Sequence, residues 1–187
     1  MLKIYAGMII FMLLIMFFFA VYLTSRFRRC PSDKILVIFG SAIGNNRSAK
    51  CIHGGGAFVL PLFQDYSYLS LTPMSINIST QNVLSKDKIK NNISSTFTVA
   101  ISTDENIMYN AAERLLNLSI SEIEDLAKEI IIGNLRLILA SFTIEEINQD
   151  SENFFETMKE NIEPELNKIG LKIINIDINN IKAVDNQ

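Results

Sequence analysis

The chain has 187 residues, of which 49% are hydrophobic and 20% charged, with a net charge of −3. Two cysteines are too few for a disulfide framework and are compatible with a reducing compartment. The charges are segregated, because residues 1–103 hold ten Lys or Arg and three acids, whereas residues 104–165 hold four basic residues and fifteen acids. The acidic part argues against a nucleic-acid partner, which needs a basic surface.

The N-terminus holds a long apolar segment, because the twenty residues from Ile4 to Leu23 carry no charge. At a rise of about 1.5 Å per residue, a helix of this length crosses the roughly 30 Å hydrocarbon core of a bilayer. The segment therefore predicts a transmembrane helix. The predicted membrane-anchor residues are Ile4, Ile10, Leu14, Phe18 and Leu23.

The residues after this segment distinguish an anchor from a cleavable signal peptide. A signal peptide has an apolar region of about 7 to 15 residues and ends in small residues at its cleavage site. Tyr22 and Leu23 occupy that place, which favours an uncleaved anchor with its juxtamembrane segment over residues 1–30. Arg26, Arg28 and Arg29 follow, and the positive-inside rule then predicts a single-pass protein with its bulk in the cytoplasm.

The region after the anchor predicts β-strands. Residues 35–39 form a continuous apolar run that ends at Gly40. Two later segments alternate apolar and polar residues with period two, which is typical of half-buried strands. Their apolar positions are Met74, Ile76 and Ile78 in one segment, and Phe97, Val99 and Ile101 in the other.

From Asp104 the period changes to that of helices. The first helix is predicted from Ile107, Ala111, Arg114, Leu115 and Leu118. Ser121 with Glu124 predicts a capping box that opens a second helix, from Ile123 to about Ala140. Thr143 with Glu146 predicts the same device for a short third helix.

A last helix and a closing strand complete the predicted α+β architecture. Gly170 ends the helix, and Pro164 inside it predicts a kink or a restart, because proline lacks an N–H and its ring clashes with the preceding turn. The apolar face of this helix is formed by Phe155, Met158, Ile162, Leu166 and Ile169, and that of the strand by Ile174, Ile176 and Ile178.

The residue types that carry chemistry occur in weak patterns. Gly54, Gly55 and Gly56 lack the spacing of a phosphate-binding loop and predict a tight turn. His53 is the sole histidine, and with Cys51 it supplies only half of a metal site. No G-x-S-x-G motif supplies a nucleophilic serine. The sequence therefore predicts a protein that is not an enzyme and has neither a cofactor nor a metal.

Seven uncharged residues, Ala57 to Phe63, follow the glycines in the basic half of the chain. They fit a buried strand, with Pro61 at its end or edge, or an exposed loop that contacts lipid. Both interpretations can hold for different residues of the run. The predicted lipid-contact residues are Phe58, Val59, Leu60, Leu62 and Phe63.

Several runs resemble flotillins, which belong to the stomatin/prohibitin/flotillin/HflK-C (SPFH, band 7) superfamily. The resemblance covers nearly all of the chain after the anchor, in the family's order and spacing. It lies in Cys30 to Asp33 leading into Ile35 to Val37, Gly54 to Gln64, Leu69 to Leu71, Ala111 to Leu116, Gly133 to Leu139, Thr143 to Ile147 and Leu166 to Leu171.

The resemblance implies a membrane scaffold that oligomerises on the cytoplasmic face of the cell membrane and organises microdomains. Its implied partners are membrane lipids, further copies of itself, client membrane proteins and an NfeD-type membrane protein. The implied domains are a β-rich, membrane-proximal SPFH subdomain over residues 31–100 and an α/β subdomain over residues 101–183. The Ile-, Asn- and Lys-rich composition without Trp is typical of an AT-rich bacterial genome.

Flotillins continue into a long coiled coil, so residues 184–187 are interpreted as the start of a coiled coil that this sequence lacks. Two alternatives to the scaffold therefore stay open. One is a regulatory subunit of a membrane protease, as other SPFH proteins are. The other is a truncated membrane-binding domain without assembly activity.

Overall fold

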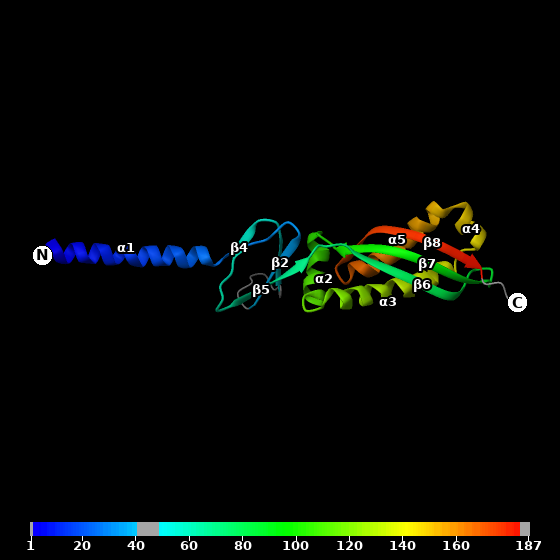
Figure 1. Ribbon diagram of the computed structural model, residues 1–187, viewed down its shortest axis with the longest axis horizontal. Helices are drawn as coiled ribbons and strands as arrows, with labels where there is room; N and C mark the ends of the chain where they lie inside the picture. Colours follow the sequence, from blue (N-terminus) through cyan, green and yellow to red (C-terminus); the bar gives the residue numbers. More distant parts are fainter. Residues whose placement is uncertain (1, 41–48, 184–187) are drawn as a thin grey trace. The chain divides into compact units, whose positions relative to one another are not determined.

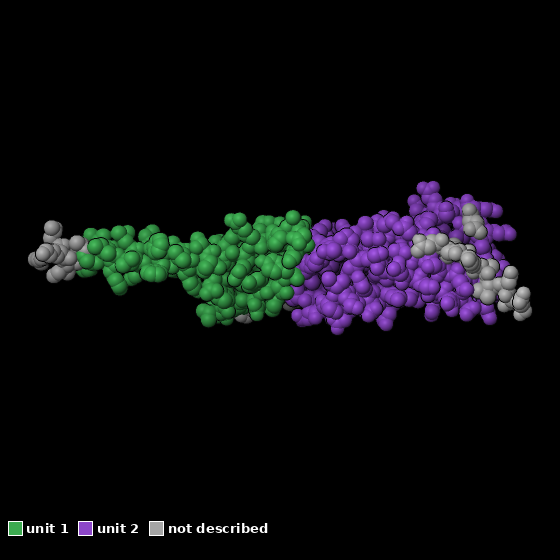
Figure 2. All heavy atoms as spheres, viewed as in Figure 1, with its two compact units in different colours: residues 1–68 green, residues 69–187 purple. Residues whose placement is uncertain are grey.

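The computed structural model describes residues 2–40 and 49–183, and it divides the chain into two compact units, Met1–Tyr68 and Leu69–Gln187 (Figures 1 and 2). Helices and strands occur in both, which confirms the α+β fold class. Residues 184–187, predicted to begin a coiled coil, lie outside the described residues.

The first unit holds one helix and short strands. The helix is α1 (Leu2–Ser25), and the strands are β1 (Phe27–Arg29), β2 (Lys34–Gly40), β3 (Ala49–His53), β4 (Gly56–Phe58) and β5 (Gln64–Ser70), which runs two residues past the unit boundary. β1 pairs with β4, while β2 lies between β3 and β5. Four consecutive residues of β2, Ile35 to Ile38, are buried, so this strand is covered on both faces, as its continuous apolar run predicts.

The second unit is a three-stranded antiparallel sheet covered by helices on one face (Figure 1). The strands, in spatial order, are β6 (Met74–Leu84), β7 (Lys90–Ile101) and β8 (Leu171–Ala183), and the helices are α2 (Glu105–Leu115), α3 (Ile120–Leu139), α4 (Ile144–Gln149) and α5 (Ser151–Asn167). α3 packs against β6, α5 packs against β8, and the two helices pack against each other. Alternate residues of β6, including Met74, Ile76 and Ile78, point into this core as predicted.

The boundary between the units lies before β6 and not near residue 100, where the sequence placed it. The reason is strand pairing, because β7 pairs with β6 on one side and with β8 on the other. β8 lies about seventy residues later in the chain, and its pairing with β7 runs from Asn91↔Ala183 to Ile101↔Leu171. Strands that were expected in the first subdomain therefore belong to the core of the second.

The helix starts show which capping box forms. The Thr143–Glu146 box of α4 is confirmed, whereas α3 is capped by Ser119 and Glu122 and not by the predicted Ser121 and Glu124. Capping at Ser119 puts Leu118 and Ile123 at the two positions of a hydrophobic staple, whereas capping at Ser121 would put Asp125 at the second. The apolar pair therefore decides between two boxes that look equivalent in the sequence.

Two other findings concern the last helix and strand. α5 continues through Pro164 to Asn167, so the predicted restart at Pro164 does not occur. In β8 the bulge between the pairs Thr98↔Asn175 and Val99↔Ile173 leaves Ile174 as an extra residue. Ile173 is therefore buried, while Ile174 is 51% exposed.

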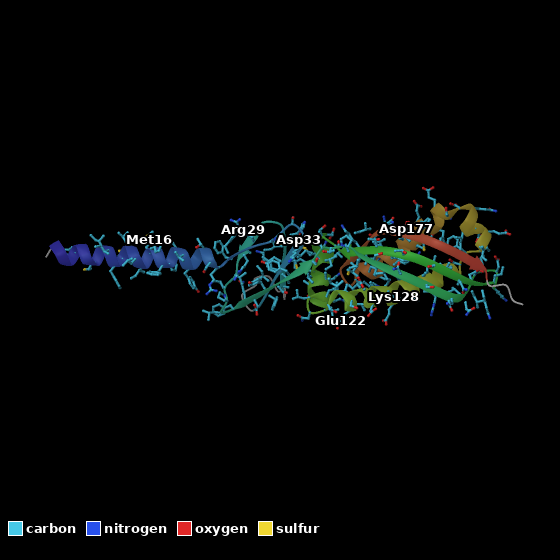
Figure 3. All side chains as sticks on the ribbon, viewed as in Figure 1. Met16, Arg29, Asp33, Glu122, Lys128 and Asp177 are labelled. Atoms are coloured by element: carbon cyan, nitrogen blue, oxygen red, sulfur yellow. The ribbon has the colours of Figure 1, made fainter. Side chains whose placement is uncertain are left out.

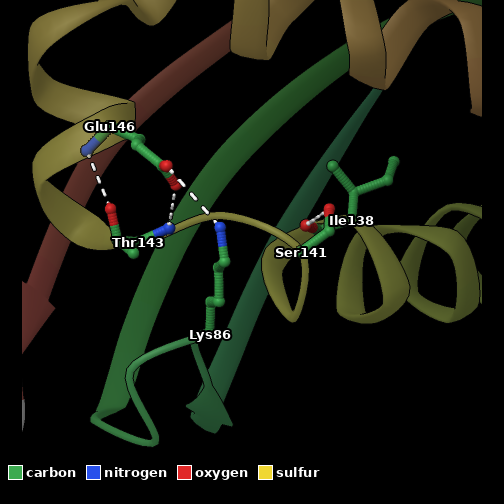
Figure 4. Close-up of polar contacts among 5 residues, drawn as sticks. All are labelled: Lys86, Ile138, Ser141, Thr143 and Glu146. Atoms are coloured by element: carbon green, nitrogen blue, oxygen red, sulfur yellow. Dashed lines mark hydrogen bonds and ion pairs between the residues drawn. The ribbon is translucent and has the colours of Figure 1, made fainter.

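We expect acid to weaken the two capping boxes. The pKa of Glu122 lies below the ordinary value of 4.5, chiefly because the backbone N–H of Ser119 donates to its carboxylate at 2.7 Å. The pKa of Glu146 is lowered in the same way by the backbone N–H of Thr143 at 2.8 Å (Figure 4). Because these pKa values are lower in the folded chain than in the unfolded one, the stability they contribute is complete above 4.5 and is lost as the pH falls through the lowered values.

The double variant Glu122→Gln/Glu146→Gln tests this expectation. Its urea midpoint should lie below that of the wild-type chain near pH 7 and converge with it as the pH falls below 4.5. Glu145→Gln, an exposed neighbour outside the box, is the matched control and should follow the wild type. Midpoints of wild type and double variant that fall in parallel would contradict the assignment.

Candidate membrane-contact site

The side chains of α1 point outward along the whole described helix, as Met16 illustrates in Figure 3. The predicted anchor residues Ile10, Leu14 and Phe18 are 60%, 50% and 68% exposed, while the side chains of Ile4 and Leu23 lie outside the described set. Within the described part of the chain, no helix is both long enough and apolar enough to cross a membrane. The transmembrane part of the fold prediction is therefore not supported there.

The basic residues after α1 lie on or next to β1. Arg26 is half-buried, and its guanidinium stacks over the ring of Tyr22 at 4.9 Å from the centroid. Arg28 is exposed and stacks over Tyr66 at 4.9 Å, and Arg29 is exposed (Figure 3). These cation–π contacts orient two of the three guanidinium groups without neutralising their charge.

β1 and β4 tie the end of α1 to the apolar run that follows the glycines. Phe27 pairs with Phe58 at the end of this ladder, and their rings meet edge to face with centroids 5.1 Å apart. The pairing is extended on both sides by backbone bonds, from Cys30 N–H to Gly55 O at 2.9 Å and from Val59 N–H to Arg26 O at 3.2 Å. The basic segment and the apolar run therefore form one local structure.

The three glycines have two different roles. Gly54 and Gly55 form the predicted turn between β3 and β4, and both have φ of +77°, which disfavours other residues. Gly56 is instead the first residue of β4. A Cβ atom there would lie 2.6 Å from the Arg28 carbonyl oxygen and 2.8 Å from the Phe27 ring, so its role is to let β1 approach closely.

The end of the apolar run is a compact exposed turn. The backbone N–H groups of Phe63 and Gln64 both donate to Leu60 O, at 3.0 and 2.8 Å, and Leu60 N–H donates to the Gln64 side chain at 3.2 Å. The exposed fractions of the predicted lipid-contact residues are 60% for Phe58, 55% for Leu60, 85% for Leu62 and 58% for Phe63. We call these four side chains the apolar turn.

Val59 does not belong to the apolar turn, although the sequence placed it with the lipid-contact residues. It is only 5% exposed and lies in a core cluster with Cys30, Leu36 and Ile38. Val59 therefore anchors the run to the first unit. Of the run, Ala57 and Phe58 lie in the strand β4, Val59 follows the strand and is buried, and the residues after it form the exposed turn.

Gly40 is a residue of this site whose role the sequence did not reveal. It was recognised only as the end of an apolar run, but its φ is +138°, and a Cβ atom there would lie 2.2 Å from the carbonyl oxygen of Phe63. The end of β2 therefore packs directly against the backbone of the apolar turn. This close approach holds the turn in place.

The residues considered for metal or catalytic chemistry do not converge. Among the described residues, no group of three or more His, Cys, Asp or Glu side chains is placed to hold a metal ion. His53 is exposed at the end of β3. The buried thiol of Cys30 donates to the carbonyl oxygens of Lys34, at 3.1 Å, and Ile52, at 3.2 Å, which gives it a structural role.

Residues 28–186 match the family described as SPFH domain / Band 7 family, which covers most of the chain. The chain belongs to this family. Its relatives include the flotillin-like protein FloT of Bacillus subtilis (strain 168), which is 31% identical over 94% of this chain and 36% of that protein. Flotillin-2 of Carassius auratus is 25% identical over 80% of this chain and 35% of that protein. Flotillin-1 of Pongo abelii is 26% identical over 83% and 36%.

These relatives confirm the predicted likeness to flotillins and make the chain a flotillin-like SPFH protein. The matched region spans only about a third of the length of each relative. The SPFH match begins at Arg28, inside β1, and so includes β4 and the apolar turn.

Proposed function

We propose that this chain is a non-enzymatic scaffold of membrane microdomains, attached to the cytoplasmic face of the cell membrane and assembled with further copies of itself. The observation that carries the proposal is the apolar turn, whose exposed side chains are held next to the basic residues of β1. Burying one Leu or Phe side chain in an apolar phase gains roughly 1.5 to 3 kcal/mol. Because its neighbours are basic, the turn suits an anionic lipid surface.

α1 is proposed as the membrane anchor of the chain. It has 24 residues, and at 1.5 Å per residue such a helix is about 36 Å long, which exceeds the roughly 30 Å hydrocarbon core. The uncharged run extends from Ile4 to Leu23, beyond the described side chains at both ends. Arg26, Arg28 and Arg29 would then lie among the headgroups, where each gains about 1 kcal/mol on an anionic leaflet.

The partners of this scaffold are part of the proposal. Its relatives are named flotillins, and flotillin-like function supports self-assembly and the gathering of client membrane proteins. An NfeD-type membrane protein is a further proposed partner. Three arginines after the uncharged run, against Lys3 before it, support the cytoplasmic orientation.

A tryptophan placed at the tip of the apolar turn tests membrane contact. The chain contains no Trp, and Leu62 is 85% exposed, so Leu62→Trp adds a unique fluorophore without disturbing packing. In vesicles with anionic lipid we expect its emission to shift to the blue and to be quenched by brominated acyl chains. Leu137→Trp, on the exposed face of α3, is the matched control and should stay unquenched. Equal quenching at both sites, or at neither, would contradict the proposed contact.

The native mass of the chain, extracted in mild detergent, tests the assembly part of the proposal. A discrete large complex would support the scaffold. A monomer at every concentration would overturn self-assembly. It would leave a membrane-binding domain as the function of this chain, provided that Leu62→Trp reports lipid contact.

A further inference from the structure

A small groove lies on the second unit between α5 and β8. It has a volume of about 250 Å³ and is lined by Phe155, Glu156 and Lys159 of α5 and by residues 173–176 of β8. The bulge in β8 directs Ile174 into this groove and not into the core. Ligand pockets for small molecules usually measure about 300 to 1,000 Å³, so the groove better suits one or two inserted side chains.

A protruding structure with matching chemistry lies at the β6–β7 hairpin. We call residues 84–90 the hairpin tip. Leu84 and Ile89 are exposed apolar residues at 52% and 43%, and Lys86, Lys88 and Lys90 surround them with one acid, Asp87. Backbone bonds from Ser85 N–H to Ile89 O at 3.0 Å and from Lys88 N–H to Ser85 O at 2.9 Å hold the tip in a defined shape.

The tip is basic, whereas the surface around the groove is acidic, although the lining itself holds one acid and one base, Glu156 and Lys159. α5 carries five Glu and one Lys, and of these Glu152, Glu156 and Glu160 are exposed at four-residue spacing along the helix. Asp177 of β8 is also exposed (Figure 3). Only two cations oppose these four acids, Lys159 at the groove and Lys172 on β8, so the surface around the groove has a surplus of negative charge.

The tip cannot fill the groove of its own chain. In β7, Phe97 pairs with Ile176 of β8, which lines the groove. At the other end of β7, Lys90 pairs with Leu84 of β6 and belongs to the hairpin tip. At about 3.3 Å per residue, the nine residue-to-residue steps from Phe97 to Lys88 place the tip roughly 30 Å from the groove along the same sheet. The tip, which is apolar and basic, therefore lies far from the apolar groove and its acidic surroundings on the same molecule.

We infer that the hairpin tip of one copy docks into the α5–β8 groove of a second copy, with Ile89 inserted against Ile174 and Phe155. This inference rests on the self-assembly in the proposed function and names its contact surface. Because the two surfaces differ, the contact is heterologous, and repeating it closes a ring or extends a chain of copies. Lys86 already pairs with Glu146 of its own chain at 3.7 Å, so Lys88 and Lys90 are the cations that face the partner (Figure 4).

Charge reversal tests this contact on the full chain in mild detergent. The tip variant Lys88→Glu/Lys90→Glu and the groove variant Glu152→Lys/Glu156→Lys each oppose like charges across the contact. We expect each alone to raise the concentration at which half of the chain is assembled by about tenfold or more. The matched control, Lys128→Glu/Arg136→Glu on exposed positions of α3, makes the same charge change as the tip variant and should assemble like the wild type.

An equimolar mixture of the tip and groove variants supplies the decisive result. In the mixture each variant tip meets a groove of opposite charge, and the remaining tips and grooves are wild type. We therefore expect large assemblies to return, with the two variants present in equal amounts. Urea unfolding of each variant alone verifies that the lost assembly is not lost folding.

The outcomes separate this contact from the scaffold proposal. A wild-type chain that is monomeric at every concentration overturns self-assembly and this contact with it. A wild-type chain that assembles while the tip variant assembles equally well overturns the contact alone. Two weakened variants whose mixture does not recover overturn the pairing of these two surfaces.

Discussion

Gly170→Ala is expected to unfold most of the second unit at room temperature. Gly170 has φ of +91°, and a Cβ atom there would lie 2.3 Å from the Cβ and backbone N atoms of Ala111 in α2. The same residue accepts a hydrogen bond from Ser102 N–H at 3.0 Å, at the end of β7. Three elements therefore meet at a position that holds no side chain.

The loss of stability is large because the new methyl group at residue 170 would meet the backbone of α2 and not a flexible side chain. A flexible side chain could turn away from a new methyl group, but the α2 backbone at Ala111 can move only if the helix shifts. Ala111 is itself fully buried, and Asn110 beside it donates from its side chain to Asn167 O at 2.9 Å. We expect a loss of about 4 kcal/mol or more in the free energy of unfolding, against a typical total of about 5 to 15 kcal/mol.

Gly133→Ala provides a matched control with the opposite sign. Gly133 lies in the exposed part of α3, and a Cβ atom there has no neighbour within 4 Å. Alanine is favoured over glycine inside a helix by about 1 kcal/mol, so this variant should be more stable than the wild type. Urea unfolding followed by circular dichroism measures both changes. A Gly170→Ala chain as stable as the wild type would show that α2 does not pack against this turn.

The sequence predicted those parts of the fold that local patterns determine. Alternation in β6 and the continuous apolar run of β2 gave the strands and their buried faces. The cap of α3 was misplaced by two residues, because two Ser-x-x-Glu patterns overlap and the choice depends on the apolar pair Leu118 and Ile123. The unit boundary was misplaced, because pairing between β7 and β8 joins residues far apart in the chain.

The sequence predicted which residue types form the candidate site but not how the fold arranges them. An uncharged run beside arginines indicated lipid contact, and four of its five named side chains are exposed. The burial of Val59 depends on Cys30 and Leu36, which only the fold brings to it. The roles of Gly40 and Gly56 are close approaches between chain segments, and no local pattern reports those.

Arginine in the middle of α1 is expected to release the chain from membranes. Phe11 and Leu14 lie near the centre of α1, and both side chains are exposed, so neither substitution disturbs a protein core. An arginine at the centre of a membrane-inserted helix costs about 2.5 to 3.5 kcal/mol. Phe11→Arg/Leu14→Arg should therefore weaken membrane binding by about 6 kcal/mol, which lowers the binding constant by a factor of roughly 10⁴ and reduces the membrane-bound fraction. Sedimentation of membranes after an alkaline wash measures this fraction.

Thr24→Arg is the matched control, because it adds a positive charge at the end of the same helix. Thr24 is exposed and lies two residues before Arg26, where a long cationic side chain can reach the headgroups. The control should therefore stay with the membrane while the double variant leaves it. If both variants remain bound after the wash, α1 is not the anchor, and attachment has to come from the apolar turn and the basic residues of β1. If both are released, positive charge anywhere near α1 opposes binding, and the proposed anionic surface is wrong.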